Sequence, residues 1–192
     1  MLIIMDKNIT NKEYEDYLKK NKKLTFINCN FGFHYDKNYK MCQGQDSFSL
    51  GEDYDSLLTF INCSIKLQSS ITALISDMKG YNYRNYNIVN SNLYIESKKI
   101  ILDGLCFSNC SIKSNKLSYI EGHDLYGSLT EINDIKDLRL FQSDLNIEGE
   151  TYKFFDYIYL NNSYLHIKDV DFGYSVATNE SVLKQEDFIY DI

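Results

Sequence analysis

The cysteines are the first residues in this sequence that suggest chemistry, because a thiolate binds metal ions and exchanges with disulfides. Cys29, Cys63 and Cys110 each follow an asparagine and precede a polar and then a hydrophobic residue. No two cysteines have the Cys-x-x-Cys spacing typical of zinc and redox sites. A serine replaces the cysteine in three related segments, so we expect a structural column with no metal ion or cofactor: Ser91, Ser143 and Ser163.

The three histidines and one acidic segment are the candidates for acid–base catalysis. His34, His123 and His166 lie far apart in the sequence and lack the spacing of a metal-binding pair. Glu121-Gly122-His123-Asp124 places an acid, a base and a glycine together, which makes it the most site-like cluster of the chain. Because such segments are usually solvated turns, we expect a loop there and no catalytic residue.

Negative charge is concentrated in the second half of the chain. Residues 97–192 contain 9 basic and 16 acidic side chains, a difference that accounts for the formal net charge of −7. Paired carboxylates perform glycoside hydrolysis, so Asp169 and Asp171, on one face of a strand, are compatible with a carbohydrate-active enzyme. The chain is small for that class, and we expect the acidic residues of this region to bind a partner: Asp144, Glu148, Glu150, Asp156, Asp169 and Asp171.

An aromatic segment is a second candidate for partner binding. Tyr81, Tyr83 and Arg84 lie together after Gly80, and tyrosine and arginine are enriched among the residues that dominate interfaces. The alternative is that these side chains pack on the body of the protein.

Length and composition bound the class of protein. A chain of 192 residues has room for one domain with a substantial core. No apolar run approaches the ~20 residues of a membrane span, and the opening run Met1–Met5 is too short for the core of a signal peptide. We therefore expect a cytoplasmic protein with reduced thiols. A pI near 5.0 argues against binding nucleic acid or an anionic membrane through net charge.

A repeated ten-residue pattern determines the expected architecture. Hydrophobic residues occupy positions one, three, eight and ten, an asparagine occupies position five, and a cysteine or serine follows it. Six segments follow the pattern, with Gln142 in place of one asparagine and Ser114 in place of one hydrophobic residue, and they begin at Leu24, Leu58, Tyr86, Leu105, Leu138 and Ile158.

Each half of the pattern alternates like a strand, but the phase shifts by one residue between positions five and six. The chain must therefore turn a corner there, with one inward face made by Phe26, Phe60, Ile88, Phe107, Leu140 and Leu160. Successive cysteine or serine positions are 34, 28, 19, 33 and 20 residues apart. The shorter intervals suit one coil, and the longer ones suit a coil with an insertion or, for 33, an additional degenerate coil. Stacking the coils about 4.8 Å apart predicts an amide ladder: Asn28, Asn62, Asn90, Asn109 and Asn162.

This pattern resembles two known groups of proteins. The stacked inward columns and the corner asparagine are similar to the parallel β-helix superfamily. Segments such as Cys63-Ser64-Ile65-Lys66-Leu67 and Ser143-Asp144-Leu145-Asn146-Ile147 also resemble pentapeptide repeats. The preceding pentads begin with bulky leucines where that family favours small residues, so we expect a wider, irregular β-helix. The resemblance covers roughly residues 24–170 and implies architecture only, since neither group has a single activity.

These observations predict an all-β, single-domain parallel β-helix or β-solenoid of about six to eight coils. Residues 1–23 are expected to form an N-terminal cap, with a helix at about 11–20 that begins with the capping box Thr10-Asn11-Lys12-Glu13. Residues 24–172 form the solenoid, with insertions near 34–57 and 68–85 and a short helix in the second. Residues 173–192 form a C-terminal cap, with a helix from Thr178 or Asn179, or an acidic tail.

The function expected from the sequence is non-enzymatic binding of a macromolecule through an acidic solenoid surface. A protein partner with a basic face, such as a nucleic-acid-binding protein or a nuclease, suits the charge. The absence of proline and tryptophan favours an AT-rich genome, and small acidic proteins of such genomes include inhibitors such as toxin-immunity proteins and phage antagonists of CRISPR effectors. The alternatives are a small β-helix carbohydrate-active enzyme and a self-assembling structural solenoid.

Overall fold

Parallel strands make up most of the computed structural model, which describes residues 1–21, 23–35, 57–69, 73–75, 86–96, 99–113, 119–132, 137–147, 157–168 and 175–186. The first half contains β1 (Leu2–Met5), β2 (Asn8–Ile9), α1 (Asn11–Lys20), β3 (Lys23–Ile27), β4 (Asn30–Tyr35), β5 (Leu57–Ile61), β6 (Ser64–Ser69), β7 (Ala73–Ile75), β8 (Tyr86–Val89) and β9 (Asn92–Glu96). The second half contains β10 (Lys99–Asp103), β11 (Leu105–Lys113), β12 (Tyr119–His123), β13 (Tyr126–Ile132), β14 (Asp137–Phe141), β15 (Asp144–Ile147), β16 (Tyr157–Asn161), β17 (Tyr164–Lys168), β18 (Ser175–Asn179) and β19 (Val182–Glu186).

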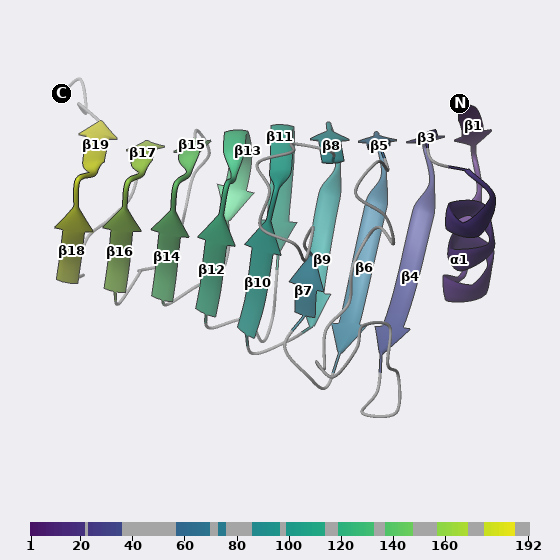
Figure 1. Cartoon of the computed structure of the whole chain (residues 1–192), viewed down its shortest axis with the longest axis horizontal. Helices are drawn as coiled ribbons and strands as arrows, with labels where there is room; N and C mark the ends of the chain where they lie inside the picture. Colours follow the sequence, from purple (N-terminus) through teal and green to yellow (C-terminus); the bar gives the residue numbers. More distant parts are fainter. Residues whose placement is uncertain are drawn as a thin grey trace, which may run out of the picture.

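The strands form two sheets that run along the long axis of the molecule (Figure 1). A 13-stranded sheet contains the path β1-β3-β5-β8-β11-β13-β15-β17-β19, and a six-stranded sheet has the order β18-β16-β14-β12-β10-β7. The first half of β11 pairs with β8 and its second half pairs with β9, so the chain turns from one side of the molecule to the next within this strand. The chain thus returns to each side one strand further along, as in a solenoid, and the fold is all-β and solenoid-like.

The core consists of side chains that point inward at alternate positions of each strand. Across the 13-stranded sheet the inward column contains Phe26, Phe60, Ile88 and Phe107, which are in register and at most 3% exposed. Leu140 and Leu160 are in register with each other in the six-stranded sheet and are fully buried. All six side chains expected on one inward face are therefore buried, but they form two columns.

Each corner is made by a residue in the left-handed region, and the corners fall into two rows. One row contains Asp6, Asn28, Asn62, Asn90 and Asn109, with φ between 47° and 55°. The other contains Gly104, Asp124, Gln142, Asn162 and Glu180. Backbone bonds connect neighbours within a row: the amide of Asn28 donates to Ile61 O at 3.0 Å, and that of Gln142 donates to Asn161 O at 2.9 Å.

The expectation of a single corner is therefore wrong, because the same sequence pattern makes two different corners of the coil. Asparagine and aspartate tolerate the left-handed region better than other residues with a side chain, wherever in the coil the corner lies. The interval of 33 residues before Ser143 contains an additional corner at Asp124, where the following residue is Leu125 instead of a cysteine or serine.

Glycine at position 122 makes room for this leucine. Gly122 faces inward between the strands that carry Leu102 and Leu140, and Leu125 is only 1% exposed. A Cβ atom at residue 122 would lie 2.5 Å from Leu125 Cδ1 and 2.9 Å from Leu140 Cδ2. In the next coil the arrangement is reversed, with a leucine at position 140 and the small Ser143 after the corner.

The helix predicted at about residues 11–20 is confirmed as α1, at the end of the molecule that holds the N-terminus (Figure 1). Thr10 and Glu13 form the predicted capping box, with Thr10 N donating to Glu13 Oε2 at 2.9 Å and Glu13 N donating to Thr10 Oγ1 at 3.3 Å. Tyr14 is 1% exposed and contacts the rings of Phe26 and Phe33, with centroids 5.7 and 5.1 Å away. This contact fixes the helix against the core of β3 and β4.

Two segments expected to be helical contain strands. Ala73–Ile75 forms β7, which pairs with β10, and the segment after residue 173 forms β18 and β19, which pair with β16 and β17. An open strand edge offers backbone partners along its whole length, and this outweighs the weak helical preference of such short segments. The ladder of strands thus continues beyond residue 172 to Glu186. Most of the expected insertions near 34–57 and 68–85 lie outside the described residues.

The corner conformation predicts how stability responds to substitution at Asn62. We expect Asn62→Ala to lower the free energy of unfolding by about 1–2 kcal/mol, because alanine disfavours the left-handed region. Asn62→Gly serves as the control and should lose less, since glycine adopts this region freely. Urea titration measures both. Equal losses would show that the side-chain contacts of Asn62, and not its backbone conformation, stabilise the corner.

Gly122 and Leu125 complement each other in size, which predicts that the effects of substituting them on the free energy of unfolding are not additive. Gly122→Leu alone should destabilise by about 1–3 kcal/mol through overpacking, and Leu125→Ser alone by about 2–5 kcal/mol through the cavity that it leaves. The double variant recreates the arrangement of Leu140 and Ser143, so we expect it to recover at least about 1 kcal/mol relative to the sum. Additive losses in a double-mutant cycle would contradict this packing.

Candidate interaction surface

The outer side of β12, β14 and β16 gathers polar and aromatic side chains from three neighbouring strands. Because side chains alternate, Ile120 points into the core while Tyr119, Glu121 and His123 point outward. The register places corresponding residues of β14 and β16 beside them. We call this set the polar-aromatic face, and its members are all half-buried: Tyr119, Glu121, His123, Asp137, Arg139, Phe141, Tyr157 and Tyr159.

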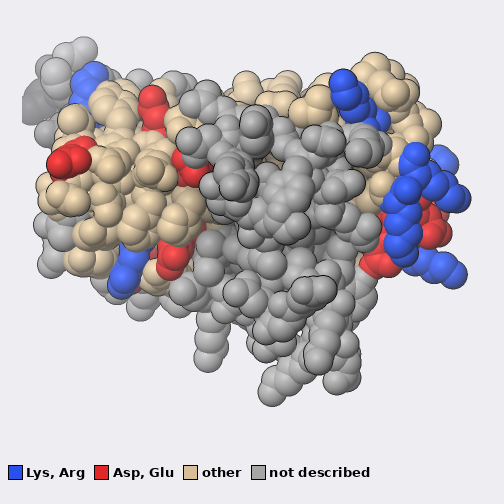
Figure 2. Space-filling view, viewed as in Figure 1, with Lys and Arg blue, Asp and Glu red and all other residues tan. Residues whose placement is uncertain are grey.

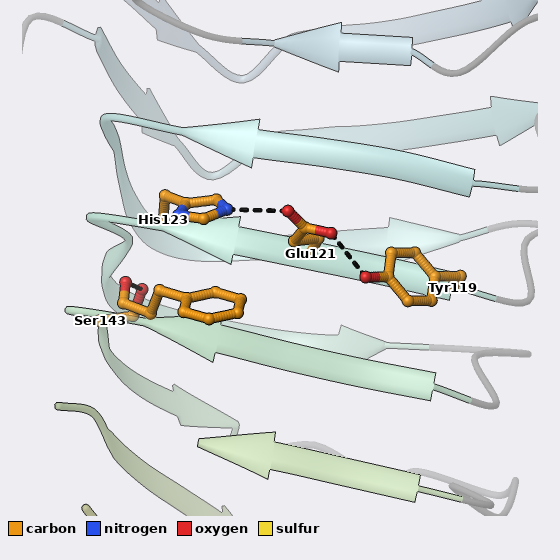
Figure 3. Close-up of polar contacts among 5 residues, drawn as sticks. Tyr119, Glu121, His123 and Ser143 are labelled. Atoms are coloured by element: carbon orange, nitrogen blue, oxygen red, sulfur yellow. Dashed lines mark hydrogen bonds and ion pairs between the residues drawn. The ribbon is translucent and has the colours of Figure 1, made fainter. Parts of the chain in front are cut away.

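Glu121 connects the three outward side chains of β12 (Figure 3). Tyr119 Oη donates to Glu121 Oε2 at 2.5 Å, and His123 Nε2 lies 3.0 Å from Glu121 Oε1. Burial, together with the bond to Glu121, raises the pKa of Tyr119 above its usual value, so its hydroxyl remains a donor at neutral pH. The loop expected at residues 121–124 is wrong, since Glu121 and His123 belong to a strand and Asp124 is a corner residue.

Arg139 is held by a carboxylate and by two tyrosine rings. Its Nε donates to Asp137 Oδ1 at 3.1 Å and its Nη2 donates to Asp137 Oδ2 at 2.9 Å. The guanidinium carbon lies 5.1 Å from the ring centroid of Tyr119 and 5.5 Å from that of Tyr157. The hydrogen bonds to Asp137 raise the pKa of Arg139 further, so its charge is permanent. Sequence reasoning missed this cluster, although opposite charges two residues apart in an alternating strand are a visible signal.

Aromatic stacking along the molecule occupies the faces of the rings. His123 lies on Phe141 with centroids 4.6 Å apart and planes 6° from parallel. On its other side Phe141 contacts Tyr159 in a tilted arrangement at 5.5 Å. Phe141 therefore contacts a neighbouring ring on each side. Figure 2 shows that the surface over these strands is largely uncharged, with acidic and basic side chains dispersed on it.

Most of the site residues expected from the sequence lie outside the described residues: Tyr81, Tyr83, Arg84, Glu148, Glu150, Asp156, Asp169 and Asp171. Asp144 is described and exposed on β15. The register places it between Tyr126 of β13 and Tyr164 of β17, around the corner from the polar-aromatic face.

The corner amides form hydrogen bonds between neighbouring coils. Asn28 Nδ2 donates to Asp6 Oδ1 at 2.9 Å, Asn62 Nδ2 to Asn28 Oδ1 at 3.3 Å, and Asn109 Nδ2 to Asn90 Oδ1 at 2.9 Å. Asn162 lies in the other row, so it belongs to a different corner from these five residues.

Where a cysteine or serine follows a corner, its side chain donates a hydrogen bond to the carbonyl two residues before it. Cys63 Sγ donates to Ile61 O at 3.3 Å, and Ser163 Oγ does the same to Asn161 O at 2.8 Å. The Ser163 hydroxyl also accepts a bond from the backbone amide of Ser143. Burial raises the pKa of Cys63 to about 11 and also raises that of Cys110. Within the described ranges no group of histidine, cysteine or acidic side chains is arranged to hold a metal ion.

Comparisons with known proteins give the chain no family. No protein-family model matches it, and no curated protein or solved structure matches it either. In the part of the chain that the structure describes, no helix is long and apolar enough to cross a membrane. Function must therefore be argued from the surface itself.

The raised pKa of Cys63 predicts slow alkylation in the folded protein. At pH 9 an ordinary thiol is about half ionised, whereas a thiol with a pKa of about 11 is about 1% ionised. We expect iodoacetamide to modify Cys63 at least about tenfold more slowly in the folded protein than in urea, with the rate still rising above pH 9. Peptide mass spectrometry follows each cysteine, and half-buried Cys106 is the internal comparison. Equal rates in the folded and unfolded states would contradict the burial of Cys63.

Proposed function

We propose that this protein is non-enzymatic and binds another protein through the polar-aromatic face. The observation that supports this most directly is Arg139, which is fixed by Asp137 and lies over the rings of Tyr119 and Tyr157. Tyrosine and arginine dominate the energetics of protein interfaces. Side chains that are already ordered before binding lose little entropy on association, which favours affinity.

The state of the carboxylates supports binding over acid–base catalysis. A glycoside hydrolase needs one carboxyl group as a proton donor and another as a base or nucleophile. Both oxygens of Glu121 contact side chains of its own strand, and both oxygens of Asp137 accept bonds from Arg139. These contacts favour a structural role for both groups.

The arrangement of the rings favours a protein over a carbohydrate as the partner. Sugar rings stack on exposed aromatic faces, but Phe141 is covered by His123 on one side and contacted by Tyr159 on the other. Ring edges and polar tips are better suited to the mixed polar and apolar surface of a protein.

The type of solenoid, its number of coils, its N-terminal cap and its location in the cell belong to the same proposal. The chain is a parallel β-helix of about six to eight coils, with α1 as its N-terminal cap, and it acts in the cytoplasm. We infer that it is an inhibitor that covers a working surface of its partner. The repeat pattern, the buried contacts of Tyr14 and the acidic composition support this view.

Affinity capture from the lysate of the native host tests the proposal. We expect one discrete protein to be retained by the wild type and lost by the variant Tyr157→Ala/Tyr159→Ala, because truncation of interface tyrosines costs about 2 kcal/mol or more each. Tyr94→Ala is the matched control, since this tyrosine is 39% exposed on β9, away from the face. Circular dichroism verifies folding. Retention of the same protein by all three chains, or of none by the wild type, contradicts the proposal.

A further inference from the structure

The strand β1 forms one edge of the 13-stranded sheet, at the end of the molecule that holds the N-terminus (Figure 1). β1 pairs with β3 on one side, and no other strand of the described residues pairs with it. Within the described ranges, the backbone groups of β1 that point away from β3 therefore have no strand beside them. Such an edge is a template for an additional strand, because a strand supplies complementary N–H and C=O groups at the same spacing.

The side chains of β1 are apolar on both faces of the sheet. Leu2 and Ile4 pack on the core, whereas the outward Ile3 and Met5 are 49% and 51% exposed. In the next strand Ile27, the register partner of Met5, is only half-buried-exposed in part because β3 has a strand on each side. A strand paired with the free edge of β1 would cover Ile3 and Met5 in the same way.

The two ends of this sheet differ in charge. Natural proteins protect an open strand edge from pairing mainly by placing charged residues on it. β19, at the opposite end, contains Lys184 and Glu186, and the exposed Glu180 precedes it. β1, with the sequence Leu-Ile-Ile-Met, contains no charged residue. The edge of β1 is therefore suited to pairing, and the edge of β19 is suited to remaining unpaired.

From this difference between the two edges, we propose that two copies of the chain pair antiparallel through β1 about a two-fold axis. The partner strand must be uncharged and apolar on both faces, and β1 of a second copy meets both requirements. An end-to-end stack of copies would instead need β19 as the second edge. A two-fold contact closes on itself, so the assembly stops at a dimer. The contact lies at the end of the molecule, and the inference goes beyond the proposed use of the polar-aromatic face.

The alternation of side chains determines the register of this contact. Outward residues must lie opposite outward residues, because directly opposed side chains of antiparallel strands point to the same face. Pairing Ile3 with Ile3 of the other copy satisfies this rule over the whole apolar run. It places Met1, which is 87% exposed, opposite Met5 of the other copy. The charged corner residue Asp6 stays outside the contact.

The size of the contact determines its expected strength. A standard interface buries about 800 Å² on each partner, and one pair of short strands buries less than that. We therefore expect a dimer with a dissociation constant of roughly 10–100 µM, so that monomer and dimer exchange in solution.

Analytical ultracentrifugation of the wild type tests this inference. Between about 1 and about 500 µM we expect the average mass to rise from 22.5 kDa toward twice that value and then to level off. A mass of 22.5 kDa over the whole range would overturn the inference. A continuing series of larger species would also overturn it, because a closed two-fold contact cannot produce such a series.

Two lysine variants locate the contact. Ile3→Lys places two like charges opposite each other and should raise the dissociation constant of the dimer at least about tenfold. Val182→Lys is the matched control, since Val182 is 56% exposed on β19 and continues the outward column of Ile3 at the other end of the sheet. It adds the same charge and should change the constant less than about twofold. Circular dichroism verifies folding. Equal losses in both variants, or a loss only in Val182→Lys, would overturn the inference.

A cysteine variant tests the register. Directly opposed residues of antiparallel strands have Cα atoms about 4.5–5.5 Å apart, a separation that a disulfide can span. Diamide accepts two electrons and two protons from a pair of thiols, and it should link Ile3→Cys chains at least about tenfold faster than Val182→Cys chains. The wild type gives the background from the native cysteines. Equal rates in the two variants, or no disulfide between Ile3→Cys chains, would contradict the pairing.

Discussion

The left-handed residue at each corner is the constraint on which the rest of this structure depends. At each described corner one residue adopts positive φ and the alternation of inward and outward side chains shifts by one residue, as at Asn28, Asn62 and Asn162. The residue after the corner must then be small or find space elsewhere. For this reason the large Leu125 after one corner is matched by the small Gly122 before it, whereas the next coil has the large Leu140 before its corner and the small Ser143 after it. Core packing, inter-coil hydrogen bonds and the positions of outward side chains all follow from where these corners fall.

The candidate interaction surface is a result of the same geometry. Because each coil repeats the register of the previous one, Tyr119, Asp137 and Tyr157 lie side by side although they are far apart in the chain. The corner residues Asp124, Gln142 and Asn162 then lie immediately beside this face. The surface is formed by strands that the buried core holds in place, so its chemistry changes by substitution of outward residues while the inward residues remain the same.

The sequence predicts the parts of this structure that depend on local rules. Strand alternation, the corner asparagines and the Thr10 capping box each have a local physical cause. The parallel strands of the six repeated segments, a corner at the fifth position of each segment, and α1 were found where they were expected. The sequence does not distinguish the two corner rows, because Asn62 and Asn162 satisfy the same backbone requirement. It also does not show that Arg139 lies over Tyr119 and Tyr157, because that contact depends on register between segments whose separation varies. Ala73–Ile75 became a strand through a neighbour, which no local preference reveals.

The backbone hydrogen bonds at the corners run in both directions between neighbouring coils. The amide of the corner residue donates to the later coil, as Asn28 does to Ile61 and Asn162 to Asn179. The amide two residues further on donates back to the earlier coil, as Ser64 does to Cys29 and Tyr164 to Ser143. Removal of a coil from the middle of the stack would therefore leave unpaired donors and acceptors on both of its neighbours.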